Sequence, residues 1–274
     1  MTTEIANWEF LLGILVDQSK RWWGFAVACQ VLVIAINLWI VVTSSSVQLA
    51  TLAAGGLAIA YTLCQWRSDR LKRVSDSMKR KFEMHDGLGW PITSRELSDL
   101  LTAVSKDVRD KIKRPLNQNY FSSKESQSPR RLLQNLEESA WWSKHLATDM
   151  TQITAAMCAV VFAAAAFAMI FTLQSAPTQV TSENIAKISV TMIVFVFSGG
   201  YFRLAFEYNR FSRESEKIEE HTHALSERQD ISEIDAIKVL HDYQIARAGA
   251  PSIPTWLWRI RQKGLNEAWA VRIH

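Results

Sequence analysis

The chain of 274 residues has 48% hydrophobic and 21% charged side chains, and its formal net charge is +4. These averages resemble those of a soluble protein, but they combine long apolar stretches with polar regions rich in both charge signs. The small basic excess lies beside the apolar stretches and gives no case for binding a nucleic-acid polymer.

Residues 1–21 predict an amphipathic N-terminal helix. Its apolar face is marked, at helical spacing, by Ile5, Trp8, Leu11, Leu12 and Leu15. A helix of this kind suits a position against the membrane surface or packing on a cytoplasmic domain.

Residues 22–66 form one charge-free stretch, bracketed by Lys20, Arg21 and Arg67. A helix needs about 20 apolar residues to cross the hydrocarbon core of a bilayer. The stretch divides at residues 43–46 into two segments of that length. The sequence therefore predicts a first transmembrane hairpin, with spans at residues 24–43 and 47–66.

Residues 67–147 are polar and predict a helical region that continues out of the membrane. The apolar face of the second span continues at Leu71, Val74, Met78 and Phe82. Gly87, Gly89 and Pro91 then end this helix. A capping role is expected for His85 and Asp86 at the same end.

Thr93 and Glu96 match a capping box, which predicts a helix from there to about Lys113, ended by Pro115. A loop at residues 117–128 follows. Ser128 then suits the cap, and Pro129 the first position, of a helix that runs unbroken into the third span.

Residues 148–206 predict a second transmembrane hairpin, with spans at residues 150–174 and 185–206. The latter contains Lys187 near one end and Arg203 near the other, so both side chains must reach the membrane surface. Residues 198–200, Ser-Gly-Gly, interrupt this span.

Residues 207–274 predict a C-terminal helical region. Apolar residues at every seventh position indicate a stalk that packs along one seam: Leu204, Phe211, Ile218 and Leu225. No alternating strand pattern occurs. The expected fold is all-α, a polytopic membrane protein whose four transmembrane helices extend into a cytoplasmic helical domain.

Lysine and arginine near the span ends predict the orientation. The loops at residues 43–46 and 175–184 contain neither residue type, whereas the opposite span ends carry many, from Lys20 to Lys217. Both termini and the polar regions are therefore expected in the cytoplasm.

The sequence contains no recognisable catalytic motif, metal-ligand set or cofactor-binding motif. His221 and His223 lie two residues apart on a predicted helix and point in different directions, which favours a solvated face. The three cysteines all lie inside spans, as small apolar fillers. We therefore expect that the protein is not an enzyme.

Small and polar residues follow one face of the second span, at Gln48, Thr51, Gly55, Ala58, Thr62 and Gln65. Similar residues on other spans are Gln30, Asn37 and Gln152. These faces either pack between helices or line a pore. Four helices with small residues inward fill their own centre, so a sizeable pore requires a homo-oligomer.

Two segments carry a family resemblance. SPRRLLQNLEESAWWSKHLA, residues 128–147, leads into the third span, and IPTWLWRIRQKGLNEAW, residues 253–269, forms the tail. Both segments, and the run Asn119, Tyr120, Phe121 and Ser122, resemble the SMODS-associated four-transmembrane pore-forming effector family. With the two hairpins, the resemblance covers nearly the whole chain.

The resemblance implies a membrane effector of bacterial antiphage defence. Such an effector disrupts the inner membrane in response to a cyclic oligonucleotide made by a cGAS-like nucleotidyltransferase. By charge, the candidates for phosphate contact are Arg67, Arg70, Lys72 and Arg73, although positive-inside topology and lipid phosphates account for the same residues. The alternative is a non-conducting membrane scaffold or receptor that recruits a partner through its cytoplasmic helices.

Overall fold

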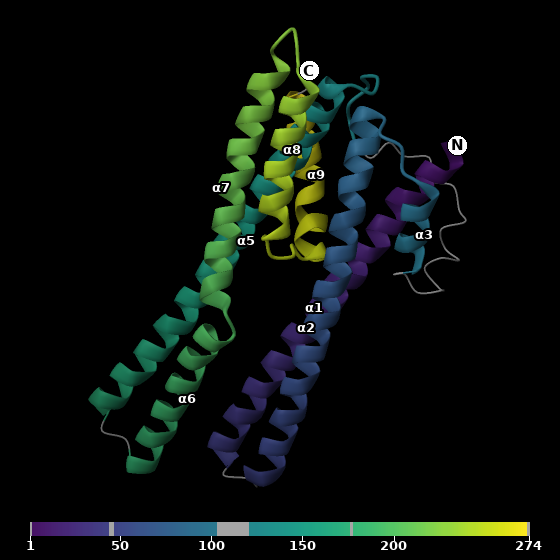
Figure 1. Ribbon diagram of the computed structural model, residues 1–274. Coiled ribbons are helices and arrows are strands. Elements are labelled where there is room, and N and C mark those ends of the chain that lie inside the picture. Colours follow the sequence, from purple (N-terminus) through teal and green to yellow (C-terminus); the bar gives the residue numbers. More distant parts are fainter. Residues whose placement is uncertain (1, 44–46, 103–120, 176–177, 273–274) are drawn as a thin grey trace. The chain divides into compact units, whose positions relative to one another are not determined.

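The computed structural model describes residues 2–43, 47–102, 121–175 and 178–272, and the regular structure in these ranges is entirely helical (Figure 1). The helices are α1 (Thr2–Thr43), α2 (Val47–Leu88), α3 (Ser94–Thr102), α5 (Pro129–Ser175), α6 (Gln179–Ser198), α7 (Tyr201–Ser226), α8 (Glu233–Ala248) and α9 (Thr255–Arg272). The all-α prediction is confirmed for this part of the chain.

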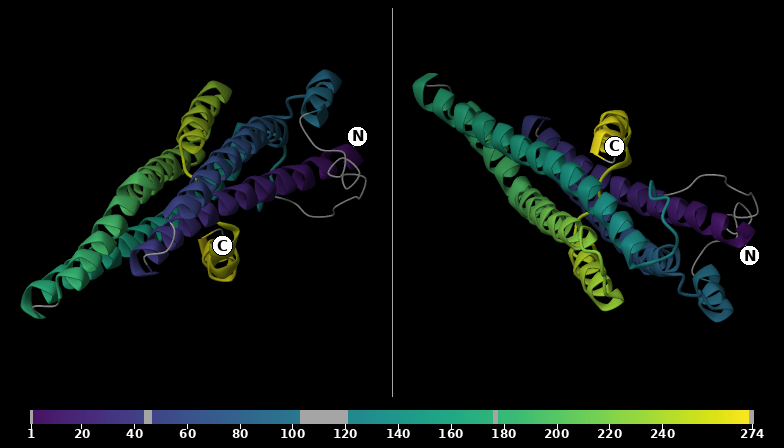
Figure 2. Two further views of the ribbon diagram at one scale, coloured as in Figure 1. Left: turned by 90° about the horizontal axis from the view of Figure 1, so that it is seen from below. Right: turned by 90° about the horizontal axis from the view of Figure 1, so that it is seen from above.

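The chain divides into two compact units. We call residues 1–20, 68–148 and 210–274 the polar unit, and residues 21–67 and 149–209 the apolar unit. Helices α1, α2, α5 and α7 each contribute residues to both units. Helix α5 has 47 residues, and Figure 2 shows it in teal as one continuous helix.

The described residues contain four helical segments that are long and apolar enough to cross a membrane. Large apolar side chains in the apolar unit remain exposed, among them Leu52 on α2 and Phe167 on α5. Exposed apolar surface of this extent is typical of contact with lipid or another protein. The prediction of four membrane-length helices is confirmed as far as their length and apolar composition are concerned.

The predicted N-terminal helix is not a separate element, because α1 continues from Thr2 through the first span to Thr43. No glycine or proline separates the two parts near Lys20 and Arg21. Leu11, Leu12 and Leu15 are buried in a cluster with α2 residues Leu71, Met78 and Phe82. The first part of α1 therefore packs within the polar unit from Leu11 onward.

A second cluster joins α5, α7 and α8. Leu132, Leu133 and Leu136 near the start of α5 pack with Ile218 and Leu225 of α7 and with α8. Ile218 and Leu225 belong to the predicted seven-residue repeat, and both are buried. The predicted packing seam on the stalk is confirmed at these positions.

The C-terminal end of α2 and the start of α5 lie where the sequence predicts them. α2 ends at Leu88, and Gly89 has φ 74°, a left-handed conformation that glycine adopts without a steric cost. α5 begins at Pro129, and the Ser128 hydroxyl accepts a hydrogen bond from the Arg131 N–H at 3.3 Å.

The capping box before α3 is formed in both directions. The Glu96 carboxylate accepts a hydrogen bond from the Thr93 N–H at 3.0 Å, and the Thr93 hydroxyl accepts one from the Glu96 N–H at 3.3 Å. The predicted continuation to Lys113 and Pro115 falls outside the described residues, as does the turn at residues 44–46. The predicted interruption of the fourth span lies at Gly199 and Gly200, between α6 and α7.

Candidate functional site

The small-residue face of α2 is exposed in a single chain. Gln48, Thr51, Gly55, Ala58 and Thr62 are exposed, and Gln65 is half-buried. A Cβ built on Gly55 would meet no heavy atom within 4 Å. No other described helix of the same chain therefore packs closely at Gly55, and both alternatives, a pore or a contact between helices of different copies, stay open.

The polar residues predicted on the other spans make different contacts. Gln30 on α1 accepts a hydrogen bond from the Tyr201 hydroxyl on α7 at 3.2 Å, so it joins two helices. The Asn37 side chain donates to the Val33 carbonyl of its own helix at 2.8 Å. Gln152 is exposed.

The structure separates the four basic residues that were candidates for phosphate contact. Arg67, Arg70 and Arg73 are exposed on α2. Lys72 is half-buried instead, and its ammonium group donates to the carbonyl of Ala250, in the linker between α8 and α9. Lys72 lines a pocket within the polar unit.

This pocket, of about 310 Å³, lies within the polar unit, and we call it the basic pocket. Its charged and polar lining consists of Ser19 and Lys20 from α1, Lys72, Ser75, Asp76 and Lys79 from α2, Ser143 from α5, Tyr243 and Arg247 from α8, and Ser252 from the linker. Leu12, Val16, Phe211 and Ile253 add apolar wall. The volume is at the lower end of the range of about 300–1,000 Å³ found for small-molecule sites.

Helical spacing places the α2 residues on one wall. Lys72, Ser75, Asp76 and Lys79 follow one another at i, i+3, i+4 and i+7, which is one face of a helix. The spacing alone does not identify this wall as part of a site, because its partners on α1 and α8 lie far away along the chain.

Two reciprocal hydrogen bonds join α1 to α2 beside the pocket. The Ser19 hydroxyl donates to the Ser68 carbonyl at 3.0 Å, and the Ser68 hydroxyl donates to the Ser19 carbonyl at 2.9 Å. Both serines are buried. Small hydroxyl side chains thus let the two helices approach closely and fix their register at this level.

Arg247 anchors the α8 side of the pocket. Its guanidinium donates to the buried carboxylate of Glu83 at 2.8 Å, lies 3.5 Å from Asp76, and stands over the Tyr243 ring at 5.5 Å. Burial opposes the charge of Arg247, but Glu83, Tyr243 and Asp76 together outweigh it and raise the pKa of the guanidinium. Arg247 Nε is buried without a hydrogen bond in the described structure.

The pocket lining carries an excess of positive charge. The lining has four cations, Lys20, Lys72, Lys79 and Arg247, and one carboxylate, that of Asp76; outside the lining, the buried Glu83 carboxylate pairs with Arg247 and lies 3.8 Å from Lys79. Burial lowers the pKa of the Lys20 ammonium group, and Asp17 opposes this while Lys79 reinforces it. A partly buried cluster of this sign is suited to bind an anion, whose charge would relieve the repulsion.

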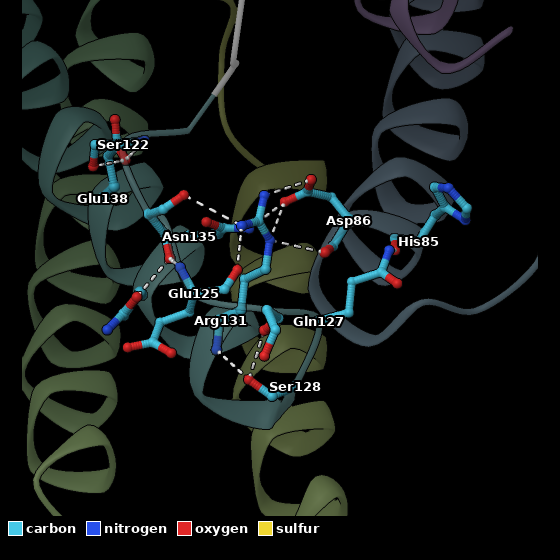
Figure 3. Close-up of polar contacts among 12 residues, drawn as sticks. His85, Asp86, Ser122, Glu125, Gln127, Ser128, Arg131, Asn135 and Glu138 are labelled. Atoms are coloured by element: carbon cyan, nitrogen blue, oxygen red, sulfur yellow. Dashed lines mark hydrogen bonds and ion pairs between the residues drawn. The ribbon is translucent and has the colours of Figure 1, made fainter. Parts of the chain in front are cut away.

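A separate polar contact fixes the end of α2 to the start of α5 (Figure 3). The Arg131 guanidinium donates to both carboxylate oxygens of Asp86, at 2.9 and 3.2 Å, and Asn135 donates to the same carboxylate at 2.6 Å. The expected capping role for Asp86 is therefore wrong, because its side chain binds another helix. Arg131 also donates to the carbonyls of Ser123 and Glu125, so it orders the segment before α5.

A second opening, of about 600 Å³, lies between α5, α7 and α9. Basic and acidic side chains are balanced there: Arg272 pairs with Glu137 at 2.8 Å, and His223 lies 3.4 Å from the same carboxylate. This opening shows no excess charge that would select a ligand. In the described residues no group of three or more His, Cys, Asp or Glu side chains could hold a metal ion.

No protein-family model, curated protein or solved structure matches the chain. The basic pocket is thus identified by its own geometry. Sequence reasoning missed Lys20, Asp76, Lys79, Tyr243 and Arg247.

Proposed function

We propose that the chain is a membrane effector of bacterial antiphage defence, which forms a homo-oligomeric pore in the inner membrane when a cyclic oligonucleotide binds its basic pocket. The polar unit and both termini lie in the cytoplasm in this proposal, and the protein is not an enzyme. The family resemblance of residues 128–147 and 253–269 supports the pathway, and the four membrane-length helices support the location.

One observation carries the proposal. Helices α1 and α2 both line the basic pocket and both continue, without a break, into membrane-length apolar segments. A ligand that binds Lys20 on α1 and Lys79 on α2 acts on the two helices that form the first hairpin. Gating requires that the ligand bind the open and closed arrangements with different affinity, and a site made of several helices provides such a difference.

The lining supports a ligand with phosphate groups. Ammonium groups and a guanidinium bind phosphate through charge-assisted hydrogen bonds, and the serine hydroxyls can add neutral ones. The apolar wall formed by Leu12, Val16 and Ile253 suits the less polar part of a nucleotide. A simple inorganic anion would leave this wall unused.

The test is dye release from liposomes that contain the purified full-length protein, with candidate cyclic oligonucleotides added. We expect release with one of them, and loss of release in Lys20→Met and Lys79→Met. Arg73→Met, an exposed cation on α2 outside the pocket lining, is the matched control and should retain release.

A second test is made in cells. Co-expression of the protein with its cognate nucleotidyltransferase, followed by activation of that enzyme, should depolarise the cell membrane. An intact membrane potential under these conditions would reject the pore. If ligand nevertheless bound to the wild type and not to Lys20→Met, the non-conducting receptor would become the better assignment.

A further inference from the structure

Helices α8 and α9 each bury one face within the polar unit and expose the other. The buried side of α8 contains Val239, Leu240 and Tyr243, and that of α9 contains Leu257, Leu265 and Trp269. We call the exposed residues on the opposite side of α8 its outer face: Ile234, Lys238, Asp242 and Ile245. The outer face of α9 is formed in the same way by Ile260, Lys263, Glu267 and Val271.

The two outer faces have the same composition in the same order. Each begins and ends with an apolar residue, and a lysine followed by a carboxylate lies between them. The apolar side chains are 65% exposed at Ile234, 60% at Ile245, 69% at Ile260 and 80% at Val271. Single exposed apolar residues are ordinary on a protein surface. Here, however, they mark both ends of two matching helix faces.

The two faces fit each other when the helices run in opposite directions. Along α8 the four residues are separated by four, four and three positions, and along α9, counted back from Val271, the intervals are the same. Such intervals keep side chains on one side of a helix. An antiparallel contact therefore pairs Ile234 with Val271, Lys238 with Glu267, Asp242 with Lys263, and Ile245 with Ile260. Every pair is either apolar or of opposite charge.

The match continues for one more turn. Trp256 precedes Ile260 by four residues, and Gly249 follows Ile245 by four. Trp256 is 50% exposed, and Gly249, the C-cap of α8, is exposed as well. The antiparallel register places this tryptophan opposite the glycine, where no side chain opposes the indole ring.

The charges exclude the parallel arrangement. With the apolar ends of the two faces aligned in parallel, Lys238 would lie beside Lys263. Asp242 would likewise lie beside Glu267. Like charges across an interface are unfavourable and act against the wrong alignment. The charged positions thus select the antiparallel contact.

The outer faces of one chain lie too far apart to meet. Helix α8 packs on α5 through Tyr243, whose hydroxyl lies 2.9 Å from that of Ser143, and α9 packs on α5 through Trp269, whose ring lies 5.3 Å from that of Trp141. Two positions along a helix correspond to a rotation of about 200°. Both views of Figure 2 accordingly show α8, in yellow-green, and α9, in yellow, on opposite sides of the polar unit.

The directions of α8 and α9 favour a ring of copies. Figure 1 shows that the two helices run in opposite directions. Rotation of a copy about an axis parallel to them preserves these directions, so α8 of one copy meets α9 of the next in the antiparallel sense. The same rotation would bring α8 parallel to its own counterpart, with Lys238 beside Lys238. A head-to-tail contact of this kind generates a ring when the rotation closes.

We infer that the outer face of α8 docks on the outer face of α9 of a second copy of the chain. This inference rests on the homo-oligomer of the proposed function, and it is independent of the identity of the ligand. Tyr243 and Arg247 of α8 also line the basic pocket. The contact therefore joins a helix of the candidate ligand site to the neighbouring copy.

The test detects the contact by disulfide formation between full-length chains in liposomes. In the starting protein, alanine replaces the native cysteines, which are Cys29, Cys64 and Cys158. One tagged chain carries Asp242→Cys and a differently tagged chain carries Lys263→Cys. The matched control replaces the second chain by Ala268→Cys, an exposed position on α9 that lies about 140° around the helix from Lys263. Only cysteines whose Cα atoms approach closely can form the bond.

We expect oxidation to join the Asp242→Cys chain to the Lys263→Cys chain several-fold more than to the Ala268→Cys chain. Disulfides between two Asp242→Cys chains instead would show that α8 meets its own counterpart, and would overturn the inference. Photobleaching of the N-terminally labelled wild type in the same liposomes counts the copies. Several copies without the Asp242→Cys and Lys263→Cys disulfide would overturn the inference and leave the homo-oligomer standing. Single copies would reject both.

Charge reversal tests whether the charged pairs set the contact. The reporter is a disulfide between Ile245→Cys in one chain and Ile260→Cys in the other. Asp242→Lys in the first chain should reduce its yield several-fold, and Lys263→Glu in the second chain should restore it. Glu220→Lys, at an exposed position on α7, makes the same charge change away from both faces and should leave the yield unchanged. A loss that Lys263→Glu does not restore would contradict the proposed register.

Discussion

Arg247 on α8 and Glu83 on α2 form an ion pair at 2.8 Å that is almost completely shielded from solvent, with Glu83 side chain 3% exposed and Arg247 side chain 12% exposed. The pair joins the C-terminal part of the polar unit to the helix that continues into the second span. It also holds Arg247 at the wall of the basic pocket. One contact therefore serves both the fold and the candidate site.

Removing one partner of this pair should destabilise the polar unit strongly. Glu83→Gln leaves the Arg247 charge buried with only Asp76 nearby, at 3.5 Å. Breaking a buried pair costs about 3–5 kcal/mol, and the remaining contact with Asp76 places the expected loss near the lower limit. Thermal unfolding in detergent, followed by circular dichroism, measures it.

Asp235→Asn is the control for this experiment. Asp235 pairs with Lys238 at 3.2 Å on the surface of α8, with the two side chains 43% and 69% exposed. Exposed pairs contribute about 0–1 kcal/mol. Equal losses for Glu83→Gln and Asp235→Asn would show that the buried pair has no special role.

Lys20 should oppose stability until a ligand binds. Burial lowers its pKa from the ordinary 10.5, so the folded state disfavours the charged form. Lys20→Met should therefore raise the unfolding temperature at neutral pH, and the gain should shrink as the pH rises to the ordinary pKa of lysine, where the unfolded chain also loses the proton.

The same variant should lose the rise in unfolding temperature that an anionic ligand gives the wild type. Arg73→Met, at an exposed position on α2, should change neither the unfolding temperature nor its rise when the ligand binds. A Lys20→Met variant that is less stable than the wild type, yet equally stabilised by ligand, would contradict the assignment of Lys20 to the pocket.

Helix ends were predictable because their signals are local. Gly89 after α2, the Thr93 and Glu96 capping box, and Pro129 at the start of α5 act within one helical turn. The membrane-length helices were equally visible, because length and apolar content alone define them. The continuity of α1 was not predicted, because Lys20 and Arg21 mark the boundary between the two units although neither residue breaks a helix.

The basic pocket was not predictable for a different reason. Its charges come from α1, α2 and α8, and Arg247 lies 164 residues from its partner Glu83. Nothing in the local pattern of α8 indicates that Arg247 is buried. The same holds for Asp86, whose partner Arg131 follows 45 residues later. Pairing across such separations is set by tertiary packing, which periodicity does not report.

Gly87 should not tolerate a side chain. A Cβ at this position would lie 2.8 Å from the Leu132 Cβ and 2.9 Å from its Cα, so the start of α5 would have to shift. We expect Gly87→Ala to destabilise the polar unit by about 1–3 kcal/mol, as overpacking does. Gly264→Ala on α9, where a Cβ meets nothing within 4 Å, should instead stabilise it by about 0.5–1 kcal/mol. Chemical unfolding of both variants measures the contrast, and a shared sign would refute it.

Glu96 should make the start of α3 sensitive to acid. Its hydrogen bonds with Lys81 and with Thr93 lower its pKa from 4.5 to about 2. A lowered pKa stabilises the folded form above the ordinary value, and this contribution disappears as the pH falls from 4.5 to about 2. Hydrogen exchange at the α3 amides, corrected for intrinsic rates, should show the loss of protection in this interval.

Glu96→Gln should weaken that protection already at neutral pH and remove most of its dependence on acid. Asp99→Asn, on the same helix but outside the capping box, is the matched control. An acid transition in the interval that is unchanged by Glu96→Gln would assign the effect to another group.

The exposed face of α2 offers the sharpest test of assembly, because two adjacent glycines differ only in direction. Gly55 lies on the face with Thr51 and Ala58, whereas Gly56 is rotated by about 100° along the helix, and a Cβ at either glycine meets nothing within 4 Å in one chain. Leucine at either site should leave the fold of the single chain intact. We expect Gly55→Leu to reduce chemically cross-linked oligomers in membranes and Gly56→Leu to leave them unchanged, because small residues permit close contact between helices of different copies.

Retained oligomers with reduced dye release in Gly55→Leu would instead place this face in the pore. Wild-type behaviour of Gly55→Leu in both measurements would remove the small-residue face from the mechanism.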